Sequence, residues 1–115
     1  MYNNKPYLSI IISQYNEINN LSRGVLSEVK EFLSTFQYSY EVIIIDDGST
    51  DEGYDFAKRF CDGLNGWNIY RIKHGGKAKG LNEGIKLAGG QLTLLTDMDQ
   101  STPLNEINKL LPFID

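Results

Sequence analysis

Short apolar runs alternate with longer segments of helical periodicity along this chain, and that alternation constrains the fold more than any other feature. Four runs are predicted to be strands because they are short and rich in β-branched or aromatic residues. They are residues 7–12, 40–46, 67–73 and 91–96. The run at 40–46 is apolar at successive positions, as expected for a strand that is covered on both faces.

Helical periodicity fills the spaces between these runs. The first predicted helix spans residues 18–36, and the second begins at a Ser49–Glu52 capping box and reaches Leu64. The third carries an apolar stripe of Leu81, Ile85 and Ala88 and is closed by Gly89 and Gly90. The last helix starts at Thr102 and Pro103. This order predicts an α/β fold, a Rossmann-like open parallel sheet of about four strands with helices on both faces. Residues 1–115 are predicted to form one domain.

Composition excludes several function classes. Hydrophobic residues make up 41% of the chain, enough for a compact core, and the net charge of -4 without a basic stripe argues against non-specific nucleic-acid binding. The single cysteine, Cys61, has no partner for an internal disulfide and falls at an apolar helical position, so a buried thiol is expected. No apolar run is long enough to span a membrane, and the start of the chain lacks a signal-peptide layout. A cytoplasmic location is therefore expected.

Polar clusters follow each of the four predicted strands. They lie at residues 13–17, 46–51, 74–80 and 97–101. Because ligands of open parallel sheets bind beyond the carboxyl ends of the strands, these four clusters are predicted to meet at one edge.

Asp97 and Asp99 stand one residue apart at the end of the last predicted strand. Residues i and i+2 of an extended segment point the same way, so both carboxylates are able to face one ion. Oxygen ligands suit Mg²⁺ or Mn²⁺, and such an ion would relieve the repulsion between the two acids. The alternative is a solvated strand end followed by an Asp helix cap.

The sequence "IIIDDGSTDE" ends the strongest predicted strand. A carboxylate at this position is able to accept hydrogen bonds from a base N–H or from ribose hydroxyls. We prefer a ligand-binding role for Asp46. For Asp47, Ser49 and Thr50 we prefer a role in shaping the turn and capping the helix.

A glycine-rich segment, "HGGKAKGLNEG", follows the third predicted strand. It is not a Walker loop, yet glycines near a helix start with Lys77 close by suit an anionic ligand. The alternative is a flexible loop with solvated lysines. His74 is the only histidine, and we expect it to be a loop residue rather than a catalytic base.

Two further candidates, Tyr15 and Glu17, follow the first predicted strand. The Tyr15 ring is able to stack on a planar base. Glu17 is able to bind a hydroxyl, or it simply favours the positive end of the following helix. The residues alone leave these readings open.

Taken in order, four segments resemble the family 2 glycosyltransferases of the GT-A fold. They are "ISQYNE", "IIDDGSTDE", "GKAKGLNEG" and "LLTDMDQSTP". As a set, a D-D-G-S-T-D segment followed by a downstream D-x-D is much more specific than either part. The end of the last segment looks closest to the branch that transfers sugars to polyprenyl (dolichyl-type) phosphates.

The resemblance implies a nucleoside-diphosphate sugar as ligand and Mg²⁺ or Mn²⁺ as cofactor. By this resemblance Tyr15, Glu17 and Asp46 match positions that hold the base and ribose, and Lys77 matches the segment near the nucleotide. Asp97 matches the first D-x-D acid, which faces the ribose or sugar. Asp99 matches the acid that holds the metal on the diphosphate, and Asp97 is a second candidate metal ligand.

The resemblance covers only the first half of the family's length. We therefore expect a nucleotide-sugar-binding domain that is truncated and incomplete for catalysis, with the acceptor-side base outside this chain. The acceptor implied is a polyprenyl phosphate or a growing glycan, and the full-length protein would work at the cytoplasmic face of a membrane. An exposed sheet edge would favour a homo-oligomer.

Three rival functions are weighed against this one. A receiver-like signalling module needs an acid pair after the first strand and a lone aspartate after the third. This sequence has "SQYNE" and "KHGG" at those places, so the fit is poor. A nucleotidyltransferase would carry a glycine-rich basic loop after the first strand, which this chain lacks. Another nucleotide-binding α/β module without transferase activity is the remaining alternative.

Overall fold

The computed structural model describes residues 5–98 of the chain, which form four strands and four helices. The elements are β1 (Leu8–Gln14), α1 (Ile18–Ser22), α2 (Val25–Ser34), β2 (Tyr40–Asp46), α3 (Gly53–Cys61), β3 (Trp67–Arg71), α4 (Lys77–Leu87) and β4 (Leu92–Asp97). The strands pair in the order β3-β2-β1-β4, and every pair is parallel. The predicted α/β class with a four-stranded parallel sheet is confirmed.

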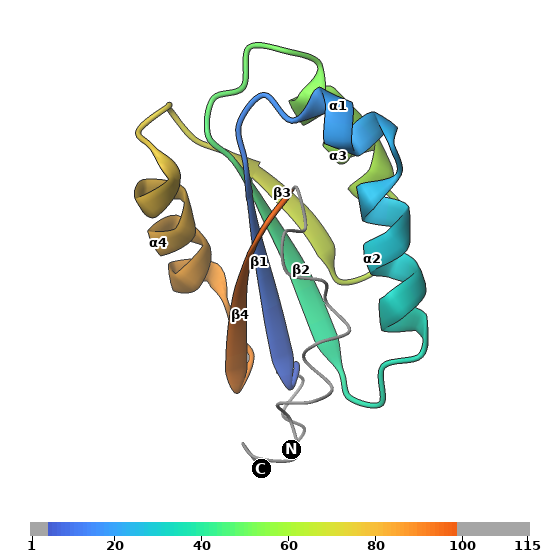
Figure 1. Cartoon of the computed structure of the whole chain (residues 1–115). Helices are drawn as coiled ribbons and strands as arrows, with labels where there is room; N and C mark the ends of the chain where they lie inside the picture. Colours follow the sequence, from blue (N-terminus) through green and yellow to red (C-terminus); the bar gives the residue numbers. More distant parts are fainter. Residues whose placement is uncertain (1–4, 99–115) are drawn as a thin grey trace.

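Helices cover both faces of the sheet, with α1, α2 and α3 on one side and α4 on the other (Figure 1). The alternation of side chains along each strand divides the core accordingly. Ile10, Ile12 and Ile44 pack in the larger cluster beneath α1 to α3. Ile11 and Ile45 belong to the smaller cluster, on the opposite face of the sheet. Both faces of β1 and β2 are therefore buried, as the unbroken apolar runs predicted.

The predicted helix over 18–36 is wrong as a single element. The chain forms α1 and α2 instead, separated at Gly24, whose φ of 95° lies in the left-handed region. A residue in this conformation interrupts an α-helix, and glycine adopts it without the steric cost of a side chain. The apolar period continues across the break because both helices pack on the same face of the sheet.

The predicted capping box is also wrong. The helix begins at Gly53 and has no side-chain cap, and it ends at Cys61 rather than at Leu64. The Ser49 hydroxyl instead accepts a hydrogen bond from the backbone N–H of Asn16, 2.9 Å away. Cys61 is buried as predicted, and burial raises the pKa of its thiol to about 11. The thiol is therefore protonated at neutral pH.

Helix α4 packs on the sheet through two glycines together with part of the predicted apolar stripe. Gly80 and Gly84 are its buried residues, whereas Ile85 is 46% exposed. A β-carbon on Gly84 would lie only 2.3 Å from Cγ2 of Ile11. The helix backbone thus lies directly against β1. Leu81 and Ala88 of the predicted stripe pack against the smaller core cluster, and Ile85 alone is turned to solvent.

Strand β4 forms one edge of the sheet within residues 5–98. Leu95 pairs in register with Ile11 and is 44% exposed. Exposed apolar groups on an open edge favour pairing with another chain, so we expect the 115-residue protein to self-associate. Sedimentation equilibrium should return at least twice the chain mass of 13.0 kDa, and a monomer at moderate concentration would contradict this.

No helix in the described part of the chain has the length and apolar character needed to cross a membrane.

Candidate functional site

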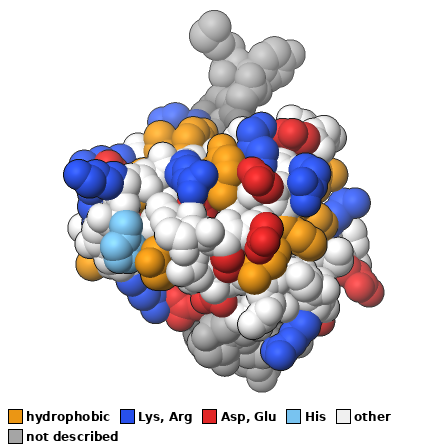
Figure 2. Space-filling model, turned by 90° about the horizontal axis from the view of Figure 1, so that it is seen from above, with side chains coloured by type: hydrophobic (Ala, Val, Ile, Leu, Met, Phe, Trp, Pro, Cys, Tyr) orange, Lys and Arg blue, Asp and Glu red, His pale blue; other side chains and the backbone are white. Residues whose placement is uncertain are grey.

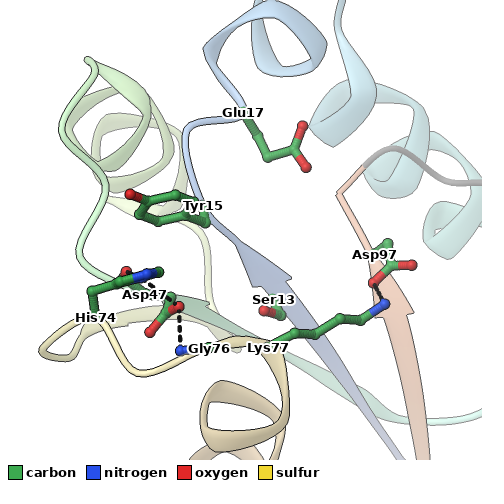
Figure 3. A pocket seen from close by; sticks show the side chains of 8 residues that line it. All are labelled: Ser13, Tyr15, Glu17, Asp47, His74, Gly76, Lys77 and Asp97. Atoms are coloured by element: carbon green, nitrogen blue, oxygen red, sulfur yellow. Dashed lines mark hydrogen bonds and ion pairs between the residues drawn. The ribbon is translucent and has the colours of Figure 1, made fainter.

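The strand register brings the ends of β1, β2 and β4 to one edge of the sheet. Gln14 pairs with Asp46, and Ser13 pairs with Asp97. The segments that follow the strands surround a pocket of about 320 Å³ at this edge. It is lined by Ser13, Tyr15, Glu17, Asp47, His74, Gly76, Lys77 and Asp97 (Figure 3). Figure 2 looks down on the same edge and shows acidic and basic side chains side by side around it.

Asp46 lies beneath the pocket rather than on its wall. Its carboxylate is buried and accepts hydrogen bonds from Nε2 of Gln14 at 2.8 Å and from the N–H of Ser49 at 2.9 Å. Nε of Arg71 lies 3.6 Å from the same carboxylate. Arg71 also donates to the carbonyl of Ser49 and stacks over the ring of Tyr54. These contacts make Asp46 the anchor of the turn that follows β2.

Asp47, the next residue, does line the pocket. Its carboxylate accepts hydrogen bonds from the N–H groups of Gly75 and Gly76 at 2.9 and 3.0 Å, which fixes the loop between β3 and α4. Gly48 lies so close that a β-carbon there would be 2.8 Å from the backbone nitrogen of His74. The turn after β2 and the loop after β3 therefore form one packed unit.

His74 and Tyr15 form an aromatic wall of the pocket. Their rings stack with centroids 4.3 Å apart and an interplanar angle of 25° (Figure 3). Nδ1 of His74 lies 2.9 Å from a carboxylate oxygen of Asp47 and 3.0 Å from its carbonyl oxygen. Both neighbours are acceptors, so Nδ1 carries a hydrogen, and Nε2 is the nitrogen left to meet a ligand.

The loop that carries Tyr15 and Glu17 is tied to the turn after β2. Asn16 adopts a left-handed backbone with φ of 53°, and its side-chain oxygen accepts from the N–H groups of Thr50 and Asp51. Glu17 points into the pocket region and accepts a hydrogen bond from the side chain of Asn20 at 2.8 Å (Figure 3). This network holds Tyr15 and Glu17 above the ends of β1 and β2.

Lys77 and Asp97 form the charged side of the pocket. Lys77 is the first residue of α4, and its Nζ lies 2.6 Å from Oδ1 of Asp97 at the end of β4. The two side chains are 60% and 35% exposed, so both remain within reach of a ligand in solvent. Asp99, the other predicted metal-binding acid, lies outside the described residues.

A divalent cation fits the chemistry of this side. Asp97 offers hard carboxylate oxygens at the pocket wall, the donor type that Mg²⁺ and Mn²⁺ prefer. Within residues 5–98 no group of three or more His, Cys, Asp or Glu side chains is arranged to hold an ion. Of the two predicted metal-binding acids, Asp97 is the one that the structure describes.

Four of the six predicted site residues lie on the pocket wall: Tyr15, Glu17, Lys77 and Asp97. Asp46 does not, and the geometry favours Asp47 in its place. The signal for this was present in the sequence, because Asp46 follows Val42 and Ile44 at the period of a strand and so faces the same helices. Ser13, His74 and Gly76 also line the wall, and the sequence placed them in the polar clusters predicted to meet there without assigning them a role in binding.

Comparison with known proteins identifies the family of this chain. Residues 9–115 match the sequence profile of Glycosyl transferase family 2. The chain belongs to glycosyl transferase family 2. The predicted family resemblance is thereby confirmed.

The relatives of the chain include transferases named for dolichyl or dolichol phosphate. Dolichyl-phosphate beta-glucosyltransferase of Dictyostelium discoideum is 31% identical over 90% of this chain and 34% of its own length. Dolichol-phosphate mannosyltransferase of Pyrococcus furiosus is 30% identical over 93% of this chain and 30% of its own length. The chain thus spans about a third of the length of these relatives.

Solved structures agree in fold. A mannosyltransferase from Pyrobaculum calidifontis in complex with GDP-Man and Mn²⁺ superimposes with a TM-score of 0.69 and 25% identity, covering 83% of this chain and 28% of its own. TarS of S. aureus gives a TM-score of 0.72 at 24% identity, covering 94% of this chain and 32% of its own. Both likenesses place the four-stranded sheet within the GT-A fold of this family.

Proposed function

We propose that this chain is the nucleotide-sugar-binding part of a glycosyltransferase, and that the pocket at the strand ends holds a nucleoside-diphosphate sugar with a divalent cation. The observation that carries the proposal is the composition of the pocket wall. One side presents stacked aromatic rings beside carboxylates, and the other presents an ammonium beside a carboxylate. A base with its ribose and a metal-bound diphosphate need these two kinds of surface.

The aromatic side would receive the nucleoside. A base adds to the Tyr15–His74 stack through its flat face, and Asp47 keeps the imidazole in place. Glu17 accepts hydrogen bonds from ribose hydroxyls. Asp46 supports the turn from below without touching the ligand.

The charged side would receive the diphosphate. Lys77 provides a mobile point charge for phosphate oxygens, and Asp97 with Asp99 provides oxygens for Mg²⁺ or Mn²⁺. When bound, the cation would neutralise negative charge on the nucleoside-diphosphate leaving group. Ser13 lines the pocket between the two sides (Figure 3).

The relatives favour one acceptor class. Because several of them are named as dolichyl- or dolichol-phosphate transferases, we infer a polyprenyl phosphate acceptor for the whole protein. A lipid acceptor would bring the whole protein to the cytoplasmic face of a membrane. Because the chain spans about a third of the length of these relatives, we expect the base that deprotonates the acceptor to lie outside it, and we expect no sugar transfer by these 115 residues alone.

Calorimetric titration of the chain with UDP, GDP and dTDP tests this function. We expect one of them to bind more tightly with Mn²⁺ than without it. Asp97→Asn should weaken that metal-dependent binding by about tenfold or more, because removing even an outer partner of a metal costs 10- to 100-fold. Asp62→Asn, which removes an exposed carboxylate paired with Lys58 and absent from the pocket wall, should leave it unchanged.

Two results would contradict the proposal. One is the absence of binding by every nucleotide with either metal. The other is stabilisation by acetyl phosphate with Mg²⁺ in place of the nucleotides, which would favour a receiver-like module.

A further inference from the structure

On the charged side of the pocket, the ammonium of Lys77 is paired with a carboxylate. The Lys77 side chain extends across the pocket from the start of α4, and its ammonium ends 2.6 Å from Oδ1 of Asp97 (Figure 3). The two residues come from elements on different sides of the cavity, one a helix start and the other a strand end. The contact therefore closes the side where the proposed function needs a metal and a diphosphate.

An ammonium in this position opposes a divalent cation. A carboxylate oxygen that holds Nζ of Lys77 presents a positive charge to any second cation within a few ångströms, and like charges at that range repel. The same ammonium is also withheld from phosphate oxygens for as long as it stays on Asp97. Each ligand alone thus meets a group that is already engaged.

The contact is nevertheless weak enough to exchange. The side chains are 60% and 35% exposed, and solvent-exposed ion pairs of this kind contribute little to stability. A diphosphate offers Lys77 an anion to replace Asp97, and a metal offers Asp97 a cation to replace Lys77. Neither partner is left uncompensated when both ligands arrive together.

We propose that Lys77 is a positioning residue that couples the binding of nucleotide to the binding of metal. Its ammonium pairs with the Asp97 carboxylate in the ligand-free chain, and it moves to the phosphate oxygens when nucleotide and metal bind. This inference rests on the proposed function of the pocket. Thermodynamic linkage makes the effect reciprocal, so the nucleotide raises the affinity for metal by the same factor by which metal raises the affinity for nucleotide. Because the pair is exposed, it should lower the affinity for metal alone by about two- to fivefold.

The test measures metal binding rather than activity. Mn²⁺ is titrated into the 115-residue chain alone, and then in the presence of saturating UDP or GDP, whichever binds. We expect Lys77→Gln to raise the affinity for Mn²⁺ alone by about two- to fivefold. The same variant should reduce the factor by which the nucleotide enhances Mn²⁺ binding.

Lys79→Gln is the matched control. It removes the same charge from the first turns of the same helix, but Lys79 approaches Gly75 and is not on the pocket wall. Any general effect of lowering the positive charge near the site should appear equally in both variants. Lys77→Arg keeps the charge and the reach, so it should preserve most of the coupling.

The outcomes separate this inference from the proposed function. If the unaltered chain binds nucleotide with metal, but Lys77→Gln and Lys79→Gln change the affinity for Mn²⁺ alone equally, the coupling role of Lys77 is overturned and the proposed function stands. If Lys77→Gln weakens binding of Mn²⁺ alone, the inference is likewise overturned. If the unaltered chain binds neither ligand, both fall together.

Discussion

Replacing Asp46 by alanine is expected to lower the free energy of unfolding by about 3 kcal/mol. The carboxylate is buried at the end of β2, where Gln14, the Ser49 backbone N–H and Arg71 converge on it. Its removal leaves buried donors without acceptors and the guanidinium of Arg71 without its carboxylate, and each such loss is costly. Urea unfolding followed by circular dichroism measures the change.

Asp62→Ala is the control for this loss of an acid. Asp62 pairs with Lys58 on the surface and is mostly exposed, so its removal should leave the urea midpoint nearly where it is. An equally small change for Asp46→Ala would show that Asp46 does not anchor the turn. That result would restore Asp46 as a candidate to contact the ligand.

Replacing Gly90 by alanine is expected to lower the free energy of unfolding by about 2 kcal/mol, the second large effect. A β-carbon at this position would lie 2.6 Å from Oγ and 2.7 Å from the backbone nitrogen of Ser9. The backbone of β1 cannot move aside without disturbing its pairing with β4. The hydrogen bond from the N–H of Gly90 to Oγ of Ser9 would also be strained.

Gly89→Ala separates this clash from the general effect of losing a glycine. A β-carbon on Gly89 would meet nothing closer than Oε2 of Glu41 at 3.8 Å, which is ordinary contact. Because alanine also restricts the unfolded chain, this variant should be neutral or stabilise the protein by up to about 1 kcal/mol. Equal effects of the two substitutions in thermal unfolding would contradict the close approach of Gly90 to β1.

The Gly90 contact matters for the pocket as well as for stability. It fixes where β4 begins beside β1, and the register then carries Asp97 to the position opposite Ser13. A shift of one residue in this pairing would turn Asp97 to the other face of the sheet. The charged side of the pocket thus depends on a glycine at the opposite end of the strand.

The sheet and the meeting of four loops followed from the sequence because they rest on short-range patterns. A strand such as 40–46 is apolar on both faces whatever lies beside it, and parallel pairing then places the strand ends together. Boundaries inside the helical regions did not follow in the same way. The period of apolar residues continues through Gly24, and only the backbone there ends α1.

The finer composition of the site depends on contacts between residues far apart in the chain. Whether Asp46 or Asp47 reaches the pocket is decided by Gln14 and Arg71 below and by Gly75 and Gly76 above. The stack of Tyr15 on His74 joins two loops in the same way. The alternation of side chains along β2 indicates that Asp46 is the buried acid. No local pattern predicts that the loop of Gly75 and Gly76 donates hydrogen bonds to Asp47.

Paramagnetic broadening by Mn²⁺ tests the central claim most directly. A ¹H–¹⁵N spectrum of the chain is recorded with the nucleoside diphosphate that binds, while traces of Mn²⁺ are added. We predict that the amide signals of Ser13, Lys77 and Asp97 broaden first, because the cation would sit at the charged side of the pocket. Tyr7, Ser39 and Tyr40 lie at the starts of β1 and β2, at the other end of the strands. Broadening centred on their amide signals would contradict the proposed site.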